Sequence, residues 1–596
     1  MDYQACKSLT AMFFEQAARL ADKPFLWVKR GGSYEPITWR AVEASVRSLS
    51  LGLRQLGLAP GERVVLVSEN RPEWLIADLA IMAAGAVSVP AYVTNTKDDH
   101  AHILGDSGAV GAIVSTRALA ARLQPAAMEA ADCRWLVAME PLAGEGSDSL
   151  ALHAWDAVIA AGEQAEDDID ARVAEVKRDD VACFIYTSGT GGVPKGVMLT
   201  HGNILCNCMG AYHLLETFGL GDEVFLSFLP LSHSYEHTAG QFFPISIGAQ
   251  IYYAEGVEHL LTNLAESRPT IMTAVPRLYE MMNQRILRGV EKAGGVKKTL
   301  FDMALRLGRK KYQEPGSLTL VERLQDSLAE RLVREKMRER FGGRLKGMVS
   351  GGAALNPDIG VFFTALGLPV LQGYGQTEAA PVVSANLPGK VKMHTVGPPL
   401  HGVEVKIAED GEILIRGELV MKGYWKDEEA TARALQNGWL HTGDIGKIDE
   451  DGYLQITDRK KDIIVLSGGD NVSPARIEGL LTLQPEIAQA MVFGDKRSHL
   501  VALLVPDEEC LREVAGPGRK AQDLSALAED PALRKALGEA LERVNASLSN
   551  IEKLRRFLVP PEPFSVENGM MTPTLKIRRH MITAAYGEQI ERLYGG

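Results

Sequence analysis

The segment Tyr186-Thr-Ser-Gly-Thr-Gly-Gly-Val-Pro-Lys-Gly196 is the most informative stretch of the chain. It follows a short apolar run at residues 181–185 and precedes a helical pattern that starts near His201. Small hydroxyl and glycine residues in such a place can bring backbone N–H groups against phosphate oxygens. The segment therefore predicts a polyphosphate-binding loop, with an ordinary Gly/Ser/Thr turn as the alternative. It is not a Walker A loop, because that pattern needs Ser or Thr after its lysine and Lys195 is followed by Gly196.

Short apolar runs alternate with helical patterns on both sides of this loop, up to about residue 440. The runs lie at residues 63–68, 110–115, 224–230, 250–254, 345–351 and 369–373. This alternation predicts layered α/β structure with mostly parallel sheets. After about residue 400 hairpin patterns appear, with Asp410-Gly411 and Asp451-Gly452 as their turns. We therefore expect a smaller α+β module at the C-terminus.

Length, composition and charge restrict the class of protein. A chain of 596 residues exceeds the usual size of one domain, so two or more domains are expected. Hydrophobic residues make up 46% and charged residues 23%, as in ordinary globular proteins. A net charge of -12 gives no general attraction to nucleic acid, whose binding depends on neutralising phosphates with Lys and Arg. We expect no nucleic-acid partner.

The cysteines and the apolar segments predict a cytoplasmic location. Six cysteines are too few and too scattered for a disulfide framework in a chain of this length. Cys206 and Cys208 lie in a helical pattern without a second ligand pair nearby, so buried thiols are the expected reading. Residues 1–20 have no continuous apolar core of a signal peptide. The apolar run at residues 75–93 is interrupted by Asp78, Gly85 and Pro90, which favours a buried helix followed by a strand.

One segment departs from the acidic character of the chain. Residues 281–346 contain 17 Lys and Arg against 8 Asp and Glu, a local excess of 9 positive charges. Apolar residues at helical spacing, Leu300, Met303, Ala304 and Leu307, make the segment amphipathic. It is either a solvated helical hairpin or a surface that makes peripheral contact with an anionic membrane.

Further motifs, together with the loop, resemble the adenylate-forming superfamily of acyl-CoA synthetases, adenylation domains and luciferases over nearly the whole chain. The motifs in order are TSGTGGVPKGV (187–197), LPLSHSYEH (229–237), SGGAALNP (350–357), QGYGQTE (372–378), GWLHTGD (438–444), DRKKDIIVLSGGDNVSP (458–474) and NGMMTPTLKIRR (568–579). Within the superfamily, the second motif, AVPRLYE at 274–280, the basic insertion after it and the TPTLKIRR ending look most like bacterial long-chain fatty acyl-CoA synthetases.

The resemblance implies a nucleotide site. It implies contacts with ATP or AMP at Thr187, Ser188, Gly189, Thr190, Gly192, Lys195, Gly351, Gly352, Ala353, Gln372, Gly373, Tyr374, Gly375, Asp444 and Arg459. The ring of Tyr374 can stack on adenine, and the neighbouring glycines let the backbone approach the base. Asp444 can accept hydrogen bonds from both ribose hydroxyls, and Arg459 can bind ribose or phosphate.

Catalytic and metal-binding roles are implied for a few of these motif residues. Thr377 offers a hydroxyl to the α-phosphate, and Lys576 is placed against the negative charge that develops there. Glu378 offers a carboxylate oxygen suited to Mg²⁺ bridging phosphates, with Thr190 as a second ligand. His233, Tyr235 and His237 are expected beside the acyl group.

The family fold implies two domains, an ATP- and acyl-binding domain at residues 1–460 and a mobile lid at residues 461–596. Lys461 is the expected hinge. The lid presents different faces in two half-reactions, and Ser467, Gly468 and Gly469 are expected to line the approach of the CoA thiol.

The chain departs from the family pattern at Gly191, where the superfamily usually has Thr. One hydroxyl contact with phosphate is thereby missing, and a hydrogen bond to a charged group is worth about 1.5 to 3 kcal/mol. The resulting expectation is somewhat weaker handling of pyrophosphate, with the activity retained.

The sequence therefore predicts ATP-dependent ligation of a medium- to long-chain fatty acid to coenzyme A, with Mg²⁺ and through an acyl-adenylate. One alternative is an enzyme that loads the acyl group onto a separate carrier protein. Another is a catalytically silent lipid-binding scaffold with the same fold, against which the retention of Glu378, Asp444, Arg459 and Lys576 argues. Chain-length preference and oligomeric state stay open at this point.

Overall fold

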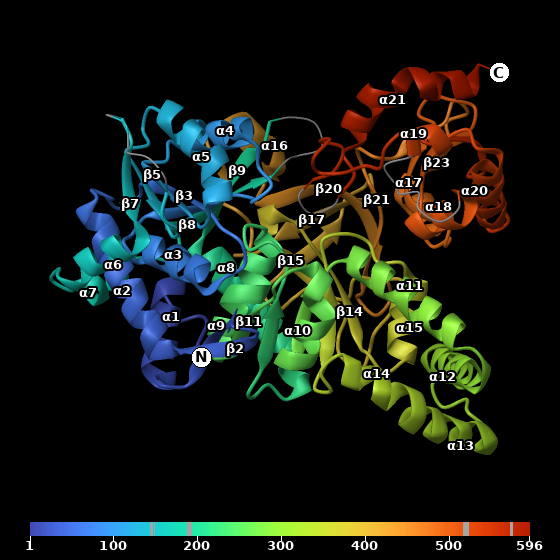
Figure 1. Cartoon of the computed structure of the whole chain (residues 1–596), viewed down its shortest axis with the longest axis horizontal. Coiled ribbons are helices and arrows are strands. Elements are labelled where there is room, and N and C mark those ends of the chain that lie inside the picture. Colours follow the sequence, from blue (N-terminus) through green and yellow to red (C-terminus); the bar gives the residue numbers. More distant parts are fainter. Residues whose placement is uncertain (143–146, 148, 188–192, 516–523, 573–575, 596) are drawn as a thin grey trace.

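The computed structural model describes residues 1–595 except 143–146, 148, 188–192, 516–523 and 573–575. A large α/β body is built on two eight-stranded sheets, and a smaller α+β domain follows it (Figure 1). The α/β class expected from the alternating pattern is confirmed. The smaller domain, orange to red in Figure 1, lies above the helices α11 (Pro276–Ala293) and α12 (Gly295–Gln313).

The first sheet carries the phosphate-loop segment. Its strand order is β18-β9-β8-β4-β3-β5-β6-β7. The bounds are β3 Arg63–Val67, β4 Val87–Pro90, β5 Gly111–Val114, β6 Trp135–Ala138, β7 Ala151–Ala154, β8 Val181–Thr187, β9 Lys195–Thr200 and β18 Gly423–Tyr424. Strands β8 to β7 are parallel, and β9 pairs antiparallel with β8.

Helices surround this sheet. Their bounds are α1 Leu9–Leu20, α2 Trp39–Gln55, α3 Pro72–Ala83, α4 Lys97–Ser107, α5 Arg117–Glu129, α6 Trp155–Glu163, α7 Ile169–Glu175 and α8 His201–Leu215. The apolar run at residues 75–93 forms most of α3 and then β4, as its pattern predicts. Cys206 and Cys208 lie in α8, and all six cysteines are buried free thiols.

The second sheet has the order β15-β14-β13-β12-β10-β11-β1-β2. The bounds are β1 Pro24–Arg30, β2 Ser33–Thr38, β10 Val224–Ser227, β11 Gln250–Tyr253, β12 Ile271–Ala274, β13 Gly347–Ser350, β14 Val370–Gly375 and β15 Val382–Ala385. Its central strands are parallel, so the carboxyl ends of β10, β13 and β14, which carry three of the motifs, meet at one edge.

Helical segments connect these strands. They are η1 Glu216–Phe218, the π-helix η2 Glu236–Phe242, α9 Phe243–Ile247, η3 Val257–His259, α10 Leu260–Ser267, α11 and α12, α13 Leu320–Ala329, the π-helix η4 Glu330–Arg334, α14 Glu335–Arg340, α15 Pro357–Ala365 and η5 Thr377–Ala379. The basic segment at residues 281–346 therefore runs from α11 through α14. Leu307 and Ala304 of α12 are buried, as their helical spacing predicts.

The hairpins expected after residue 400 form a third, five-stranded sheet. Its bounds are β16 Glu404–Ile407, β17 Glu412–Arg416, β19 Leu435–Gln436, β20 Trp439–Ile448 and β21 Leu454–Arg459, with α16 Glu428–Ala434 beside it. Ile413, Leu440 and Leu454 belong to the same apolar cluster as the large body, so this sheet packs onto that body rather than onto the C-terminal domain.

The smaller C-terminal domain has its own hydrophobic core, which runs from Ile464 to Ile590. Its elements are β22 Ile464–Val465, β23 Asn471–Val472, α17 Pro474–Leu481, β24 Ile487–Phe493, β25 Leu500–Pro506, α18 Glu508–Ala515, α19 Leu524–Leu527, α20 Pro531–Asn545, β26 Leu554–Leu558 and α21 Arg579–Tyr594. Separate cores allow the two parts to move relative to each other, as domains commonly do.

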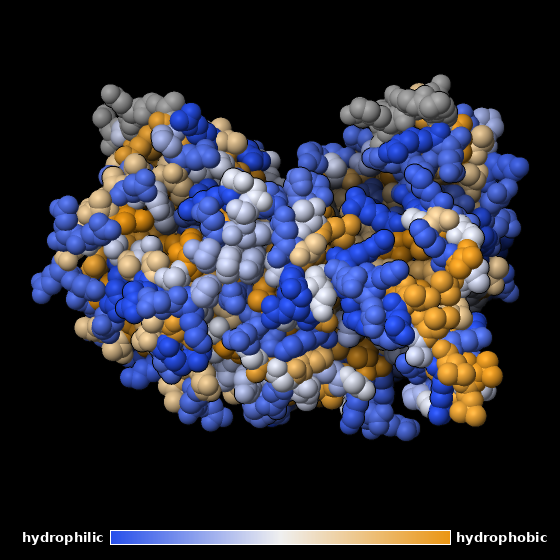
Figure 2. All heavy atoms as spheres, turned by 60° about the horizontal axis from the view of Figure 1, so that its bottom comes forward, coloured by the Kyte–Doolittle hydropathy of each residue, from blue (hydrophilic) through white to orange (hydrophobic). Residues whose placement is uncertain are grey.

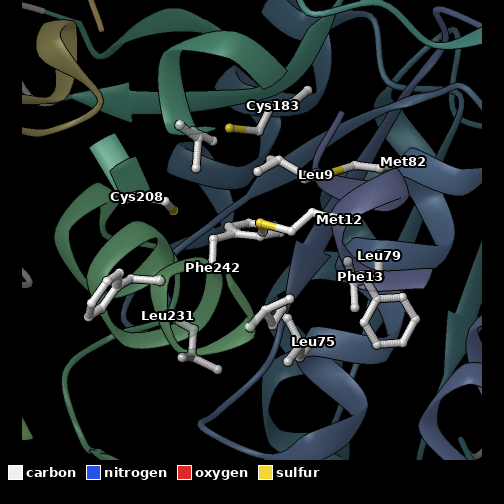
Figure 3. Packing of buried hydrophobic residues seen from close by; sticks show 14 of the residues in the cluster. Leu9, Met12, Phe13, Leu75, Leu79, Met82, Cys183, Cys208, Leu231 and Phe242 are labelled. Carbon is white, nitrogen blue, oxygen red and sulfur yellow. The ribbon is translucent and has the colours of Figure 1, made fainter. Parts of the chain in front are cut away.

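The main core lies where α1 and α3 meet the second sheet's helical connections (Figure 3). Leu9, Met12 and Phe13 of α1 lie close to Leu75 and Leu79 of α3, with Leu231 and Phe242 opposite. Among the described residues no helix is both long and apolar enough to cross a membrane.

Candidate active site

Asp444 and Arg459 face each other because β20 and β21 pair antiparallel with these two residues in register. Arg459 Nε lies 3.1 Å from Asp444 Oδ1. The hydroxyl of Tyr374, at the end of β14, donates to Asp444 Oδ2 at 2.6 Å. Burial and the Asp444 carboxylate hold the pKa of Tyr374 well above its usual value. Strands of two sheets therefore bring together Tyr374, Asp444 and Arg459, for which the resemblance implies contacts with the nucleotide.

The glycines of the QGYGQTE motif allow β14 and β15 to pack closely against each other. A Cβ on Gly375 would lie 1.9 Å from the carbonyl oxygen of Pro381, and one on Gly373 would lie 3.1 Å from that of Ser384, so β15 packs directly against them. Gln372 precedes them on the same strand and is buried.

The SGGAALNP motif follows β13 at the same edge. A Cβ on Gly351 would lie 3.0 Å from the ring of Tyr235, and Gly352 has a φ of +83°, a conformation that favours glycine. Ala353 is exposed next to them. The backbone of this motif therefore lies close to the ring of Tyr235 from the LPLSHSYEH motif. The resemblance implied a close approach to the base instead.

Glu378 lies in η5, and its carboxylate is held in place from the first sheet. The hydroxyl of Tyr424, on β18, donates to Glu378 Oε1 at 2.8 Å. Thr377 Oγ1 lies 3.0 Å from Ser234 Oγ, which comes from the LPLSHSYEH motif. Thr377 and Glu378, which are predicted to contact phosphate and metal, are therefore each held by a hydrogen bond to another side chain.

Lys195 begins β9 and lies close to this group. Its ammonium is 2.8 Å from Asp427 Oδ2 and 5.3 Å from the ring centroid of Tyr424. Thr187 ends β8 directly opposite Lys195 in the pairing register. Ser188, Gly189, Thr190, Gly191 and Gly192 lie outside the described residues, so their predicted phosphate and metal contacts have no structural account.

Lys576 reaches the same place from the C-terminal domain. It interacts electrostatically with Arg459, Asp444 and Glu378, and its charge also acts on His233. The surrounding protein and the Arg459 guanidinium lower the pKa of Lys576 to about 8, against the opposing effect of the two carboxylates, although the side chain keeps contact with solvent. A cation of the C-terminal domain thus lies within electrostatic range of two carboxylates of the large body.

The three residues predicted beside the acyl group have different surroundings. Burial, followed by the charge of Lys576, lowers the pKa of His233 to about 3, so its imidazole is neutral. Tyr235 is buried and donates its hydroxyl to the Val349 carbonyl at 2.9 Å. His237 is fully buried, with Nε2 2.9 Å from Asp78 Oδ2. His233 therefore lies within electrostatic range of Lys576, and His237 lies in the core.

Lys461 and the three residues predicted to line the CoA path lie on the surface. Lys461 is exposed in the turn after β21. Ser467, Gly468 and Gly469 are exposed between β22 and β23, where the Ser467 N–H donates to the Arg497 carbonyl within the C-terminal domain.

Tyr424, Asp427 and Ser234 are site residues that the sequence analysis missed. Ser234 lies inside a motif already recognised, so its polarity was an available signal. Tyr424 and Asp427 had none, because β18 is a two-residue strand that pairs with β9 more than two hundred positions earlier in the chain.

The chain matches two protein-family models. The model described as AMP-binding enzyme matches residues 13–425, and the one described as AMP-binding enzyme C-terminal domain matches residues 461–596. Similar curated proteins include Long-chain-fatty-acid--CoA ligase FadD15 of Mycobacterium tuberculosis, 34% identical over 98% of this chain and 97% of that protein. Long chain acyl-CoA synthetase 7, peroxisomal, of Arabidopsis thaliana is 33% identical over 94% of this chain and 82% of that protein.

Solved structures share the fold. The A domain of carboxylic acid reductase from Segniliparus rugosus, in complex with AMP and a co-purified carboxylic acid, matches with a TM-score of 0.78 and 23% identity over 99% of this chain and 95% of that one. A benzoate CoA ligase from Burkholderia xenovorans LB400 matches with a TM-score of 0.71 and 24% identity over 96% and 99% of the two chains. With its two matched models and its full-length relatives, this chain belongs to the AMP-binding enzyme family.

Proposed function

We propose that this protein ligates a medium- to long-chain fatty acid to coenzyme A at the expense of ATP, through an acyl-adenylate. The observation that carries the proposal is that Lys576 of the C-terminal domain lies within electrostatic range of Glu378, Asp444 and Arg459 of the large body. A scaffold without catalysis would have no need to keep a cation with a lowered pKa beside these groups. The substrate class follows the printed names of the relatives, which are long-chain fatty acid ligases.

In the first half-reaction a carboxylate oxygen of the fatty acid attacks the α-phosphorus of ATP. The bond from that phosphorus to the bridging oxygen breaks, and pyrophosphate leaves with the bonding electrons. Negative charge grows on the α-phosphate oxygens, where the Lys576 ammonium and the Thr377 hydroxyl stabilise it. Lys195 and the loop at residues 187–192 hold the departing phosphates.

The nucleoside part of ATP is held by the residues of β14, β20 and β21. Tyr374 stacks on adenine, and its bond to Asp444 fixes the carboxylate that receives the ribose hydroxyls. Arg459 holds the other oxygen of Asp444 at 3.1 Å and adds a charge near the phosphates.

Glu378 fits a magnesium ion that is shared with substrate phosphates. Among the described residues no cluster of three His, Cys, Asp or Glu side chains could hold a metal alone. Mg²⁺ is commonly bound by one or two carboxylates together with substrate phosphates. The Tyr424 hydroxyl donates to Oε1 of Glu378, so Oε2 would be the oxygen that holds such an ion, with Thr190 as the other proposed ligand. When bound, the ion neutralises charge on the departing pyrophosphate.

In the second half-reaction the CoA thiol attacks the acyl carbonyl and AMP leaves. We propose that residues 461–596 turn about Lys461 between the two steps, which removes Lys576 and brings Ser467, Gly468 and Gly469 to the thiol path. The domain boundary between residues 460 and 461 is part of this proposal. It is supported by the separate core of the C-terminal part, which starts at Ile464.

The acyl chain is proposed to lie beside His233, Tyr235 and His237. A neutral His233 suits an apolar neighbour better than a charged one, because burying a charge without a partner is unfavourable. The proposal also includes a cytoplasmic location with peripheral contact to the inner face of an anionic membrane, where the amphiphilic substrate gathers.

An AMP-release assay over carboxylates from acetate to oleate, with and without CoA, tests the function. Fatty acids of about 8 to 18 carbons should exceed acetate and benzoate in kcat/KM, since each buried CH₂ contributes about 0.8 kcal/mol. Acetate or benzoate as the best substrate would contradict the substrate class. Pyrophosphate release without thioester formation from CoA would point instead to a carrier protein as acceptor, and no pyrophosphate release with any acid would point to a scaffold.

A further inference from the structure

Helix α13 turns its apolar side away from the protein. Leu320, Val321, Leu324 and Leu328 are 78%, 65%, 75% and 47% exposed, and Leu332 in the following turn is 41% exposed. Leu320, Leu324, Leu328 and Leu332 are spaced by four residues, so they form one continuous stripe along the helix. We name these five side chains the α13 apolar face. A surface helix of a globular protein normally buries such a stripe.

Ion pairs hold α13 in this orientation. Lys310 and Lys311 of α12 lie 2.8 Å from Glu322 and 3.0 Å from Asp326 of α13. The buried guanidinium of Arg334, on the turn after α13, also pairs with Asp326, at 2.7 Å. The charged side of α13 is therefore its packed side, so the apolar face is a stable part of the fold.

The segment that contains the α13 apolar face has a net positive charge. Arg323 and Arg331 are exposed on or directly after α13. The segment from residue 281 to 346 carries an excess of 9 positive charges in a chain with a net charge of -12. The apolar stripe thus lies within the basic segment of an otherwise acidic chain. This combination favours an occupant that is apolar inside and anionic at its surface.

The place and size of the face also favour a broad surface over a second copy of the chain. Helix α13 lies at the outer edge of the molecule (Figure 1), and Figure 2 shows the apolar patch at that edge, with hydrophilic atoms around it. Ten helical residues span about 15 Å with a width near 10 Å. A standard protein interface buries roughly 800 Å² on each partner, more than such a face offers.

We propose that the α13 apolar face inserts into the interfacial layer of an anionic lipid bilayer, with Arg323 and Arg331 at the headgroups. The proposal deepens the membrane contact of the proposed function by assigning it to apolar insertion at one helix. This proposal differs from electrostatic attraction by the basic segment alone, because the apolar face would provide most of the free energy of membrane binding. Membrane binding of this kind needs neither ATP nor CoA.

The test is co-sedimentation of the full chain with vesicles, without any substrate. The vesicles contain phosphatidylcholine with or without 30% phosphatidylglycerol, and the variant is Leu324→Asp with Leu328→Asp. The control is Leu261→Asp with Val257→Asp, two exposed apolar side chains, 44% and 47% exposed, on α10 and the turn before it. The melting temperature checks the fold of each variant without any reference to catalysis.

We expect wild type and control to bind the anionic vesicles, and the α13 variant to lose about tenfold or more in partition coefficient at an unchanged melting temperature. Charge-reversal of Lys297 and Arg309 should lower binding less than the α13 variant does. Equal binding by the α13 variant and wild type, or no vesicle binding by wild type, would overturn the proposal. So would a dimeric wild type that becomes monomeric in the α13 variant by light scattering, because the face would then belong to a second copy. Because no substrate is present, none of these outcomes depends on whether the protein has the proposed ligase activity.

Discussion

Glu378 and Tyr424 are joined by one hydrogen bond of 2.8 Å, and this pair is where the metal assignment can be tested. Glu378→Gln should slow adenylation and raise the Mg²⁺ requirement, because an amide is a neutral and poorer ligand for a hard cation. Tyr424→Phe should raise the Mg²⁺ concentration for half-maximal rate about tenfold, since partners that orient a ligand are worth about that much in affinity. Pyrophosphate release against Mg²⁺ concentration measures both.

The control for Tyr424→Phe is Tyr34→Phe, which removes a tyrosine hydroxyl bonded to the Tyr253 carbonyl at 3.0 Å in another part of the fold. It should leave the Mg²⁺ dependence unchanged. A Glu378→Gln variant with wild-type rate and Mg²⁺ dependence would show that the metal is held elsewhere.

The lowered pKa of Lys576 makes a prediction about pH. The ammonium is charged below its pKa of about 8 and neutral above it, so its stabilisation of the α-phosphate is lost as pH rises through that value. The kcat/KM of pyrophosphate release for ATP reports groups of the free enzyme. It should therefore fall above pH 8, and in Lys576→Arg the fall should move to higher pH, because a guanidinium stays charged. A wild-type profile that stays flat to pH 9.5 would contradict this.

At the scale of elements, helix α11 contacts the C-terminal domain directly. Arg288 lies 2.9 Å from Asp507 and 2.7 Å from Glu509. Arg288→Glu should loosen the orientation that presents Lys576, and slow adenylation about three- to tenfold, because exposed ion pairs contribute at most about 1 kcal/mol each and reversal adds repulsion. Thioester formation from supplied acyl-AMP should be spared. Half-reaction rates measure the effect.

Arg497→Glu is the matched control, because Arg497 pairs with Glu591 inside the C-terminal domain and does not bridge the domains. It should leave the ratio of the two half-reactions unchanged. An Arg288→Glu variant with the same ratio as wild type would show that this contact does not hold the adenylating orientation.

The elements differ in how well the sequence predicts them, for physical reasons. Strands such as β3, β5 and β11 follow from local apolar runs, and the hairpin of β16 and β17 from its Asp410-Gly411 turn. The pairing of β18 with β9 has no local signal, so the partners of Glu378 and Lys195 were not foreseen. For α13 the spacing reveals an amphipathic helix but not which side packs, since distant lysines of α12 decide that.

At the scale of the whole molecule, the site depends on two domains meeting. Lys576 is more than a hundred positions from Asp444 and Arg459 in the chain, and the motif resemblance named all three without placing them. Their mutual interaction required the fold of both domains. The sequence does not predict the preferred acyl chain length, because the depth of an acyl pocket depends on side chains from several elements.

The proposed hinge at Lys461 gives a prediction at this scale. Lys461→Pro should stiffen the turn after β21, because proline fixes φ near about -65°. Adenylation should be retained while thioester formation is lost, since only the second step requires the domain to turn. Separate assays of pyrophosphate release and of CoA acylation from supplied acyl-AMP measure this, and equal losses in both would argue against a hinge at Lys461.

The central claim is that Lys576 stabilises charge in adenylation alone, and Lys576→Ala tests it most directly. The measurement compares the variant with wild type in pyrophosphate release from ATP and fatty acid, and in CoA acylation from supplied acyl-AMP. We predict that the first rate falls about 100- to 1000-fold, the usual effect of removing one such stabiliser, while the second stays close to wild type. Equal losses in both half-reactions would contradict the account, because Lys576 would then support the fold of its domain rather than one chemical step.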